Sequence, residues 1–179
     1  MRKAAQALLF IVVGLGAARA QILYDNGSDP GVYSWQINFG YSVTNSFVLA
    51  RTAHVDQIAI SIWDVDDQNN PIATDWKITT APFGGSTVAS GNSFLGLMNG
   101  CQENRHFFCQ WEMAIHVNAD LPAGTYWIQV ENMHTTYGTD AFWGQSSGPS
   151  RAYLYCGENR SGAVIREIPS ESFQVRGTP

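Results

Sequence analysis

The chain has 179 residues, of which 45% are hydrophobic, and a formal net charge of −5. This length suffices for one domain with a hydrophobic core. The acidic balance argues against nucleic acid as a partner, because phosphate backbones bind to basic surfaces. Beyond the N-terminus, no apolar stretch approaches the roughly 20 residues that span a bilayer, so the sequence predicts no membrane span in the mature protein.

The N-terminus has the three parts of a secretory signal peptide. The basic residues Arg2 and Lys3 precede an uncharged, mostly apolar run over residues 4–17, and Ala18-Arg19-Ala20 forms an A-x-A cleavage site. A transmembrane anchor is the alternative, but the apolar run is shorter than the roughly 20 residues that a membrane span requires.

The expected organisation is therefore a signal peptide over residues 1–20 and a single domain over residues 21–179. Cleavage before Gln21 would remove three of the ten basic residues and none of the fifteen acidic ones, which leaves a net charge of −8. The expected location is secreted, either extracellular or periplasmic.

Along the domain, apolar and polar residues alternate with a period of two, which is typical of strands with one buried face. The clearest core-facing series, in chain order, are Ile58, Ile60 and Ile62; Phe107, Cys109, Trp111, Met113, Ile115 and Val117; and Tyr126, Ile128 and Val130. Turns rich in Gly, Pro, Asn and Asp separate the runs. Many short strands with such turns predict an all-β fold, an antiparallel β-sandwich of jelly-roll-like form.

An acidic segment lies between the predicted strands 58–65 and 73–80, and we expect it to close a hairpin. Asp64, Asp66, Asp67 and Asp75 could hold a hard cation such as calcium. The segment lacks the Gly and Glu of an EF-hand loop, so we predict weak calcium binding or none, and no metal or other cofactor. The alternative is a solvated turn whose charges discourage edge-to-edge aggregation.

Three cysteines in an exported chain suggest one disulfide and one residual thiol. Cys101 and Cys109 flank a short polar segment and are the favoured pair, with Cys156 left over. Pairing of Cys109 with Cys156 is the second possibility, and three reduced, buried thiols are the third.

The order of several short strand-and-turn phrases resembles exported bacterial β-sandwich proteins of the PEP-CTERM type, which have no established activity. The phrases are Leu23-Tyr24-Asp25-Asn26-Gly27, Ser46-Phe47-Val48-Leu49, Thr74-Asp75-Trp76-Lys77-Ile78, Pro82-Phe83-Gly84-Gly85, Leu121-Pro122-Ala123-Gly124-Thr125-Tyr126-Trp127 and Ile168-Pro169-Ser170-Glu171-Ser172-Phe173. The resemblance implies an extracellular β-sandwich. The sorting tail of such proteins does not occur in this sequence, which favours a freely released or periplasmic protein.

Three patterns that could indicate an enzyme or a metal site are weak. Gly144-Gln145-Ser146-Ser147-Gly148 matches the G-x-S-x-G nucleophile elbow, but Gly148-Pro149 replaces the helix that the elbow requires. Glu112 and Glu131 face away from the predicted core on strands that could be neighbours, and paired carboxylates serve glycoside hydrolysis. The four histidines have no metal-ligand spacing, although His54 and His116 fall in predicted strands.

The aromatic residues are the more informative feature. Trp63 and Trp127 lie on the mostly polar sides of their strands, and Trp143, Tyr153 and Tyr155 lie in or near a Gly- and Ser-rich loop. Exposed rings beside polar groups form binding platforms, and flat rings suit the apolar faces of sugars. The alternative is that loops or a second layer bury these rings.

The sequence therefore favours a secreted, non-catalytic module that binds a glycan, and its expected partner is an extracellular polysaccharide or a component of the cell envelope. A structural or matrix protein without a small ligand is the alternative, and a secreted hydrolase is the third possibility.

Overall fold

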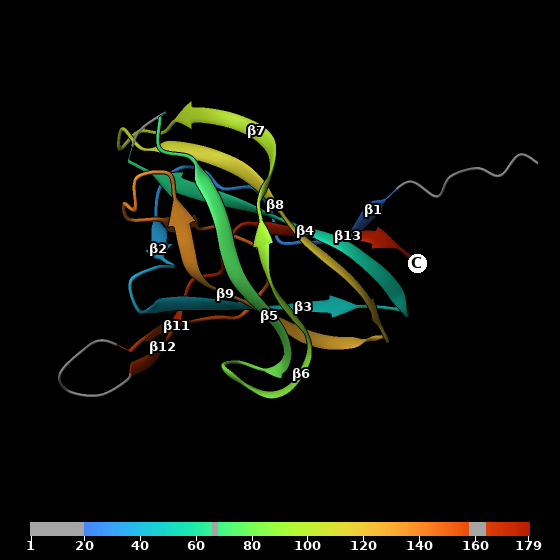
Figure 1. Cartoon of the computed structure of the whole chain (residues 1–179). Coiled ribbons are helices and arrows are strands. Elements are labelled where there is room, and N and C mark those ends of the chain that lie inside the picture. Colours follow the sequence, from blue (N-terminus) through green and yellow to red (C-terminus); the bar gives the residue numbers. More distant parts are fainter. Residues whose placement is uncertain (1–19, 66–67, 158–163) are drawn as a thin grey trace, which may run out of the picture.

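The computed structural model describes residues 20–65, 68–157 and 164–179, which fold into two antiparallel β-sheets packed face to face (Figure 1). The predicted all-β sandwich is confirmed, and the described residues contain no helix. The predicted signal peptide lies outside these residues except for Ala20. No helix long and apolar enough to cross a membrane occurs among the described residues.

Sheet A has seven strands among the described residues. β4 (Ala53–Asp64) is central and pairs along its whole length with β8 (Cys109–Leu121), which in turn pairs with β7 (Gly96–Glu103). The other edge of β4 pairs with the remaining strands in two sections. The first section is β13 (Phe173–Thr178) followed by β1 (Gln21–Asp25), and the second is β10 (Phe142–Gly144) followed by β2 (Ser34–Gln36).

Sheet B has six described strands. Their order is β12 (Val164–Ile168), β11 (Ala152–Cys156), β3 (Tyr41–Leu49), β9 (Gly124–Thr135), β5 (Pro71–Ala81) and β6 (Gly84–Phe94). β9 is a central strand, because β3 and β5 pair with its two edges. The next strand along the chain after β6 is β7, so Leu95 marks the point where the chain passes from sheet B to sheet A.

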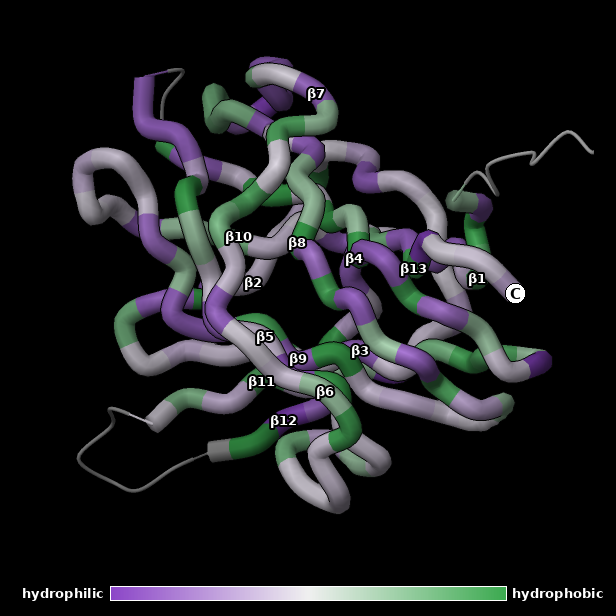
Figure 2. Tube along the Cα trace, turned by 45° about the vertical axis from the view of Figure 1, so that its right-hand side comes forward, coloured by the Kyte–Doolittle hydropathy of each residue, from purple (hydrophilic) through white to green (hydrophobic). Residues whose placement is uncertain are grey.

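The core lies between the sheets and is built from the alternation that the sequence predicts. Figure 2 shows hydrophobic and hydrophilic residues following one another along strands of both sheets. Ile58, Ile60 and Ile62 of β4 are fully buried, and their partners on β8 are Ile115, Met113 and Trp111. On sheet B, Tyr126, Ile128 and Val130 of β9 are buried opposite Phe47, Asn45 and Val43 of β3. Each fully buried aliphatic side chain contributes about 1.5–3 kcal/mol.

Two local predictions are wrong. The acidic segment does not close a hairpin, because β4 belongs to sheet A and β5 to sheet B. The segment is a connection between the sheets, and Asp66 and Asp67 lie outside the described residues. Phe107 does not extend the core face of β8: it has a φ of 65° and is exposed, since the chain turns before Cys109.

The predicted disulfide is confirmed. Cys101 of β7 and Cys109 of β8 are joined, with their Cα atoms 5.0 Å apart, and Cys156 is buried and takes no part in a disulfide. The bridge fastens the β7–β8 tip. His106 in this tip reaches the loop after β1, where its Nε2 atom lies 3.0 Å from the carbonyl oxygen of Val32. The bridge therefore steadies a tip that packs over the outer side of sheet A.

A buried polar junction ties the C-terminal segment to three other parts of the chain. The backbone N–H of Glu171 donates to Asn45 Oδ1 (2.9 Å), and its carbonyl oxygen accepts from Asn26 Nδ2 (2.6 Å) and Ser146 Oγ (3.1 Å). The Glu171 carboxyl group is fully buried, and neither oxygen has a hydrogen-bond partner among the described residues. Burial, with a smaller contribution from Asp29, raises the pKa of Glu171 well above its ordinary value of 4.5.

The Glu171→Gln variant should remove a pH dependence of stability. Because the pKa is raised in the folded state, the folded protein binds more protons, so the free energy of unfolding falls as pH rises from about 4.5 through the folded pKa. The loss amounts to about 1.4 kcal/mol for each unit of the shift. Urea unfolding between acidic and mildly alkaline pH should show a smaller fall in Glu171→Gln than in the wild type, and the part that remains is expected from Asp29, whose pKa is also raised by burial.

Glu167→Gln is the matched control, because it makes the same chemical change at a largely exposed carboxylate. An identical fall in Glu171→Gln and in the wild type would show that this carboxyl group is not responsible.

Candidate functional site

The outer surface of sheet B carries an ordered polar surface. Strand register aligns outward-pointing residues into rows that cross the strands from β6 through β5, β9 and β3 to β11. The first row is Asn92, Asp75, Glu131, Ser42 and Tyr155; the second is Ser90, Lys77, Gln129, Thr44 and Tyr153; the third, which ends at β3, is Thr87, Thr79, Trp127 and Ser46. We call these rows the sheet B face.

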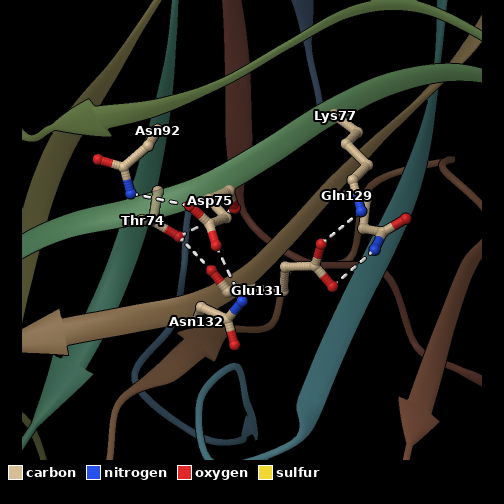
Figure 3. Close-up of polar contacts among 7 residues, drawn as sticks. All are labelled: Thr74, Asp75, Lys77, Asn92, Gln129, Glu131 and Asn132. Carbon is tan, nitrogen blue, oxygen red and sulfur yellow. Dashed lines mark hydrogen bonds and ion pairs between the residues drawn. The ribbon is translucent and has the colours of Figure 1, made fainter.

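Glu131 is held by two partners in the middle of this face. Lys77 Nζ lies 2.7 Å from Glu131 Oε1, and Gln129 Nε2 donates to Glu131 Oε2 at 2.9 Å (Figure 3). Each carboxylate oxygen thus has a donor of its own. The group is fixed in position, while its remaining lone pairs and the other Lys77 protons are available to a ligand.

Asp75 lies beside Glu131 and is held by two amides. Asn92 Nδ2 donates to Asp75 Oδ1 and Asn132 Nδ2 donates to Asp75 Oδ2, both at 2.8 Å (Figure 3). These hydrogen bonds, from Asn92 first and Asn132 second, lower the pKa of Asp75. Asn132 has a φ of 51° at a register shift between β5 and β9. Such backbone conformations are unfavourable for non-glycine residues, and they often occur at functional sites.

Aromatic rings form the other end of the sheet B face. The Phe83 ring lies 5.7 Å from the Tyr155 ring, and Trp127 lies 5.6 Å from Tyr153. The Arg151 guanidinium lies over the Tyr153 ring at 5.5 Å. Phe83 has a φ of 50° in the turn between β5 and β6, and this turn brings its ring to Tyr155 on a strand three places away in the sheet.

A hollow of about 360 Å³ lies between the aromatic end and the polar centre of this face. Tyr155 and the turn at Phe83 line one side, and Lys77, Gln129 and Glu131 line another. Beside Gln129 in the second row lies Thr44, which is fully buried and whose hydroxyl has no partner among the described residues. The hollow therefore combines aromatic rings with fixed donors and acceptors.

A larger hollow of about 450 Å³ lies on the outer side of sheet A, against the loop after β1. Its polar groups hold that loop: Asp29 Oδ2 accepts from Ser61 Oγ (2.8 Å) and Trp63 Nε1 (2.6 Å), and Asp25 Oδ2 accepts from Gln174 Nε2 (2.9 Å). Burial raises the pKa of Asp29 despite its hydrogen bonds. The two aromatic residues among its lining, Trp111 and Phe173, belong to the core. This hollow is a weaker candidate, because it presents no exposed ring.

The three tryptophans of the predicted platform are buried, as the alternative interpretation of the sequence holds. Trp63, Trp127 and Trp143 have exposed fractions of only 3%, 7% and 0%. Trp63 and Trp127 do lie on the outer sides of their strands, but Trp63 is packed near His106 and Phe108 of the β7–β8 tip, and Trp127 near Tyr153. Trp143 is a core residue whose Nε1 donates to the carbonyl oxygen of Ser172. Alternation predicts the side of a strand but not what covers that side.

Of the five predicted platform residues, the structure brings together Trp127, Tyr153 and Tyr155, with both tyrosines partly exposed. Trp63 and Trp143 belong to the other sheet. Sequence reasoning missed Phe83, Lys77, Gln129, Asn92 and Asn132 as members of one surface. The alternation in 75–77 and 129–131 signals outward polar side chains, but their proximity depends on the pairing of β5 with β9.

The other candidate sites of the sequence are separated or used structurally. Glu112 lies in sheet A and Glu131 in sheet B, so the predicted neighbouring of their strands is wrong. Ser146 is nearly buried, and its hydroxyl donates to the carbonyl oxygens of Asn26 and Glu171. Asp64 Oδ1 accepts from Val65 N–H and Thr139 Oγ1, whereas Asp75 is bound by amides on the sheet B face. The described residues include no group of three or more His, Cys, Asp or Glu side chains placed to hold a metal ion.

No known protein-family model matches the chain, and no curated protein is significantly similar to it in sequence.

Trp63→Ala should destabilise the protein as strongly as Trp111→Ala. Both indoles are buried, and truncation of a buried Trp leaves a cavity that costs about 3–5 kcal/mol. Urea unfolding at neutral pH should show this loss for both variants, whereas Tyr33→Ala, which removes an exposed ring, should change the free energy of unfolding by less than about 0.5 kcal/mol. If Trp63→Ala were as stable as the wild type, the loop after β1 and the β7–β8 tip would not cover this ring in solution.

Proposed function

We propose that this protein is a non-catalytic binding module of the cell exterior and that its sheet B face binds a glycan. The observation that carries the proposal is the hollow where Phe83 and Tyr155 meet Lys77, Gln129 and Glu131. Sugar rings have apolar faces that stack on aromatic side chains, and hydroxyl groups that need both donors and acceptors. This hollow supplies both within one surface.

The polar groups on this face are preorganised. Asp75 accepts two hydrogen bonds from neighbouring amides, and Glu131 has one hydrogen bond from an amide and one ion pair. The positions of both carboxylates are therefore set before any ligand arrives. A ligand that meets fixed groups avoids part of the entropy cost of ordering side chains. Preorganisation therefore favours binding by a surface that is otherwise shallow.

The charge states on this face favour binding over hydrolysis. A glycoside hydrolase needs one carboxylic acid whose pKa is raised so that it can donate a proton to the leaving group. On the sheet B face the pKa of Asp75 is lowered, and Glu131 is paired with Lys77. Asp75 is therefore poorly suited to donate a proton at neutral pH, and Glu131 is engaged by Lys77 and Gln129, so we propose that no bond is broken here.

The proposed location is the cell exterior or the periplasm. Its support is the signal-peptide pattern of residues 1–20, the likeness to PEP-CTERM-type exported proteins, and the disulfide between Cys101 and Cys109, a bond that persists in oxidising compartments. The proposed partner is accordingly an extracellular polysaccharide or a glycan of the cell envelope.

A structural or matrix role is the second candidate, and one observation favours it. Phe94 and Leu97, on either side of the passage from β6 to β7, are 77% and 63% exposed. Apolar side chains on neighbouring exposed positions can mediate self-association. A protein that assembles through this segment and binds no polysaccharide would fit the structural role instead.

Tyr155→Ala should weaken glycan binding without unfolding the protein. The ring is partly exposed and its loss removes the stacking surface next to Phe83, so we expect at least a tenfold increase in Kd, or about 1.4 kcal/mol. Gln129→Ala should also weaken binding, because it removes a donor that holds Glu131. Binding would be measured first on a polysaccharide array and then by calorimetry on the glycan identified there.

Tyr137→Ala is the matched control, because it removes an exposed tyrosine ring outside the sheet B face. Thermal melting would verify that each variant is folded. Equal affinities of wild type, Tyr155→Ala and Gln129→Ala for the same glycan would exclude this face as its binding site.

A further inference from the structure

Both basic side chains that the structure describes on the sheet B face and at its border, Lys77 and Arg151, are paired with carboxylates. Lys77 pairs with Glu131 at 2.7 Å, and Arg151 lies 3.5 Å from Glu167. Glu167 continues the second row, because it pairs with Tyr153 on the next strand, β12. Asp75 keeps its charge, and each of its carboxylate oxygens accepts a hydrogen bond from an uncharged amide, Asn92 or Asn132 (Figure 3). A polyanion would find Lys77 and Arg151 already paired with carboxylates of the protein. A polycation would have to compete with Lys77 and Arg151 for those carboxylates.

The donors and acceptors of the sheet B face that are not used in its internal contacts suit a polar, uncharged ligand. The amide oxygens of Asn92, Asn132 and Gln129 lie beside amide nitrogens that are already donating within the face. Lys77 has three protons, of which the Glu131 contact takes one. Sugar hydroxyl groups can donate to these amide oxygens and accept from the Lys77 ammonium group, and they bring no charge into the face.

The arrangement of these groups is elongated across the strands. The first row runs from the Tyr155 ring on β11 over Ser42 on β3 and Glu131 on β9 to Asp75 on β5 and Asn92 on β6. Four strand intervals of about 4.8 Å make this row about 19 Å long. One sugar unit can therefore stack on the aromatic end, and several further sugar units have room over the polar groups.

From this arrangement we infer that the ligand of the sheet B face is a neutral, linear polysaccharide whose chain lies across the strands, from the aromatic pair Phe83 and Tyr155 to the amide pair Asn92 and Asn132. This inference rests on the proposed function and adds two properties to it: the absence of charge on the ligand and the direction of its chain. Both properties follow from the internal pairing of the basic side chains and from the register of the rows.

The first experiment compares three classes of polysaccharide on the purified protein. The neutral set is xylan, mixed-linkage β-glucan and glucomannan; the anionic set is alginate and polygalacturonate; the cationic probe is chitosan. We expect binding within the neutral set, with a Kd that changes less than about twofold between about 0.05 and 0.5 M NaCl, since uncharged contacts are not screened by salt. Preference for alginate, polygalacturonate or chitosan, with affinity lost at high salt, would overturn the inference and leave the proposed function standing. Absence of binding to all three classes would overturn the proposed function itself.

The second experiment tests the direction of the chain with oligosaccharides of the bound neutral glycan. Tyr155→Ala should weaken both the trisaccharide and the hexasaccharide, whereas Asn92→Ala should weaken the hexasaccharide severalfold and leave the trisaccharide unchanged. Asn99→Ala is the matched control, because this amide lines the sheet A hollow on the other side of the sandwich. A hexasaccharide that binds no more tightly than the trisaccharide, or that is insensitive to Asn92→Ala, would overturn the cross-strand path.

Discussion

The register of β9 between β3 and β5 is the constraint on which both the core and the sheet B face depend. Tyr126, Ile128 and Val130 must face the core, and this requirement turns Gln129 and Glu131 to the outer side. A slip by one residue would bury the Glu131 charge and expose three large apolar side chains. The apolar, core-facing residues of β9 thus fix the positions of its polar, outward-facing residues.

Two departures from regular strand geometry complete the face. Asn132 and Phe83 both have positive φ, and each brings its side chain to a partner on another strand, Asp75 in one case and Tyr155 in the other. Positive φ in a non-glycine residue is unfavourable, so the surrounding sheet must enforce it. Strand pairing in sheet B therefore holds the two backbone conformations that bring these side chains to their partners.

The sequence is sufficient to predict the fold class and the sides of the strands. Alternation places Ile58, Ile60 and Ile62 in the core and Trp63 on the opposite side, and the spacing of Cys101 and Cys109 identifies the disulfide. Each of these inferences uses only neighbouring residues, which is the range over which local pattern is informative.

The remaining features depend on which strands are adjacent, and local pattern does not contain that information. The segment after Asp64 has the composition of a hairpin turn, yet it joins two sheets because β4 pairs with β8 while β5 pairs with β9. Trp63 is on a polar side of its strand, yet the disulfide-linked β7–β8 tip covers it. Glu131 becomes a neighbour of Asp75 and Lys77 only through the pairing of β5 with β9. Burial of an outer residue and assembly of a surface are both tertiary properties.

The most direct test of this account is to map backbone amide chemical shifts of the isotope-labelled protein during titration with the neutral oligosaccharide that binds most tightly. A glycan bound on the sheet B face should change the shifts of Lys77, Gln129, Glu131 and Tyr155 and leave the amides of the sheet A hollow, such as Asp29 and Asn99, unchanged. Shift changes centred on Asp29 and Asn99, with the sheet B face unaffected, would contradict this account.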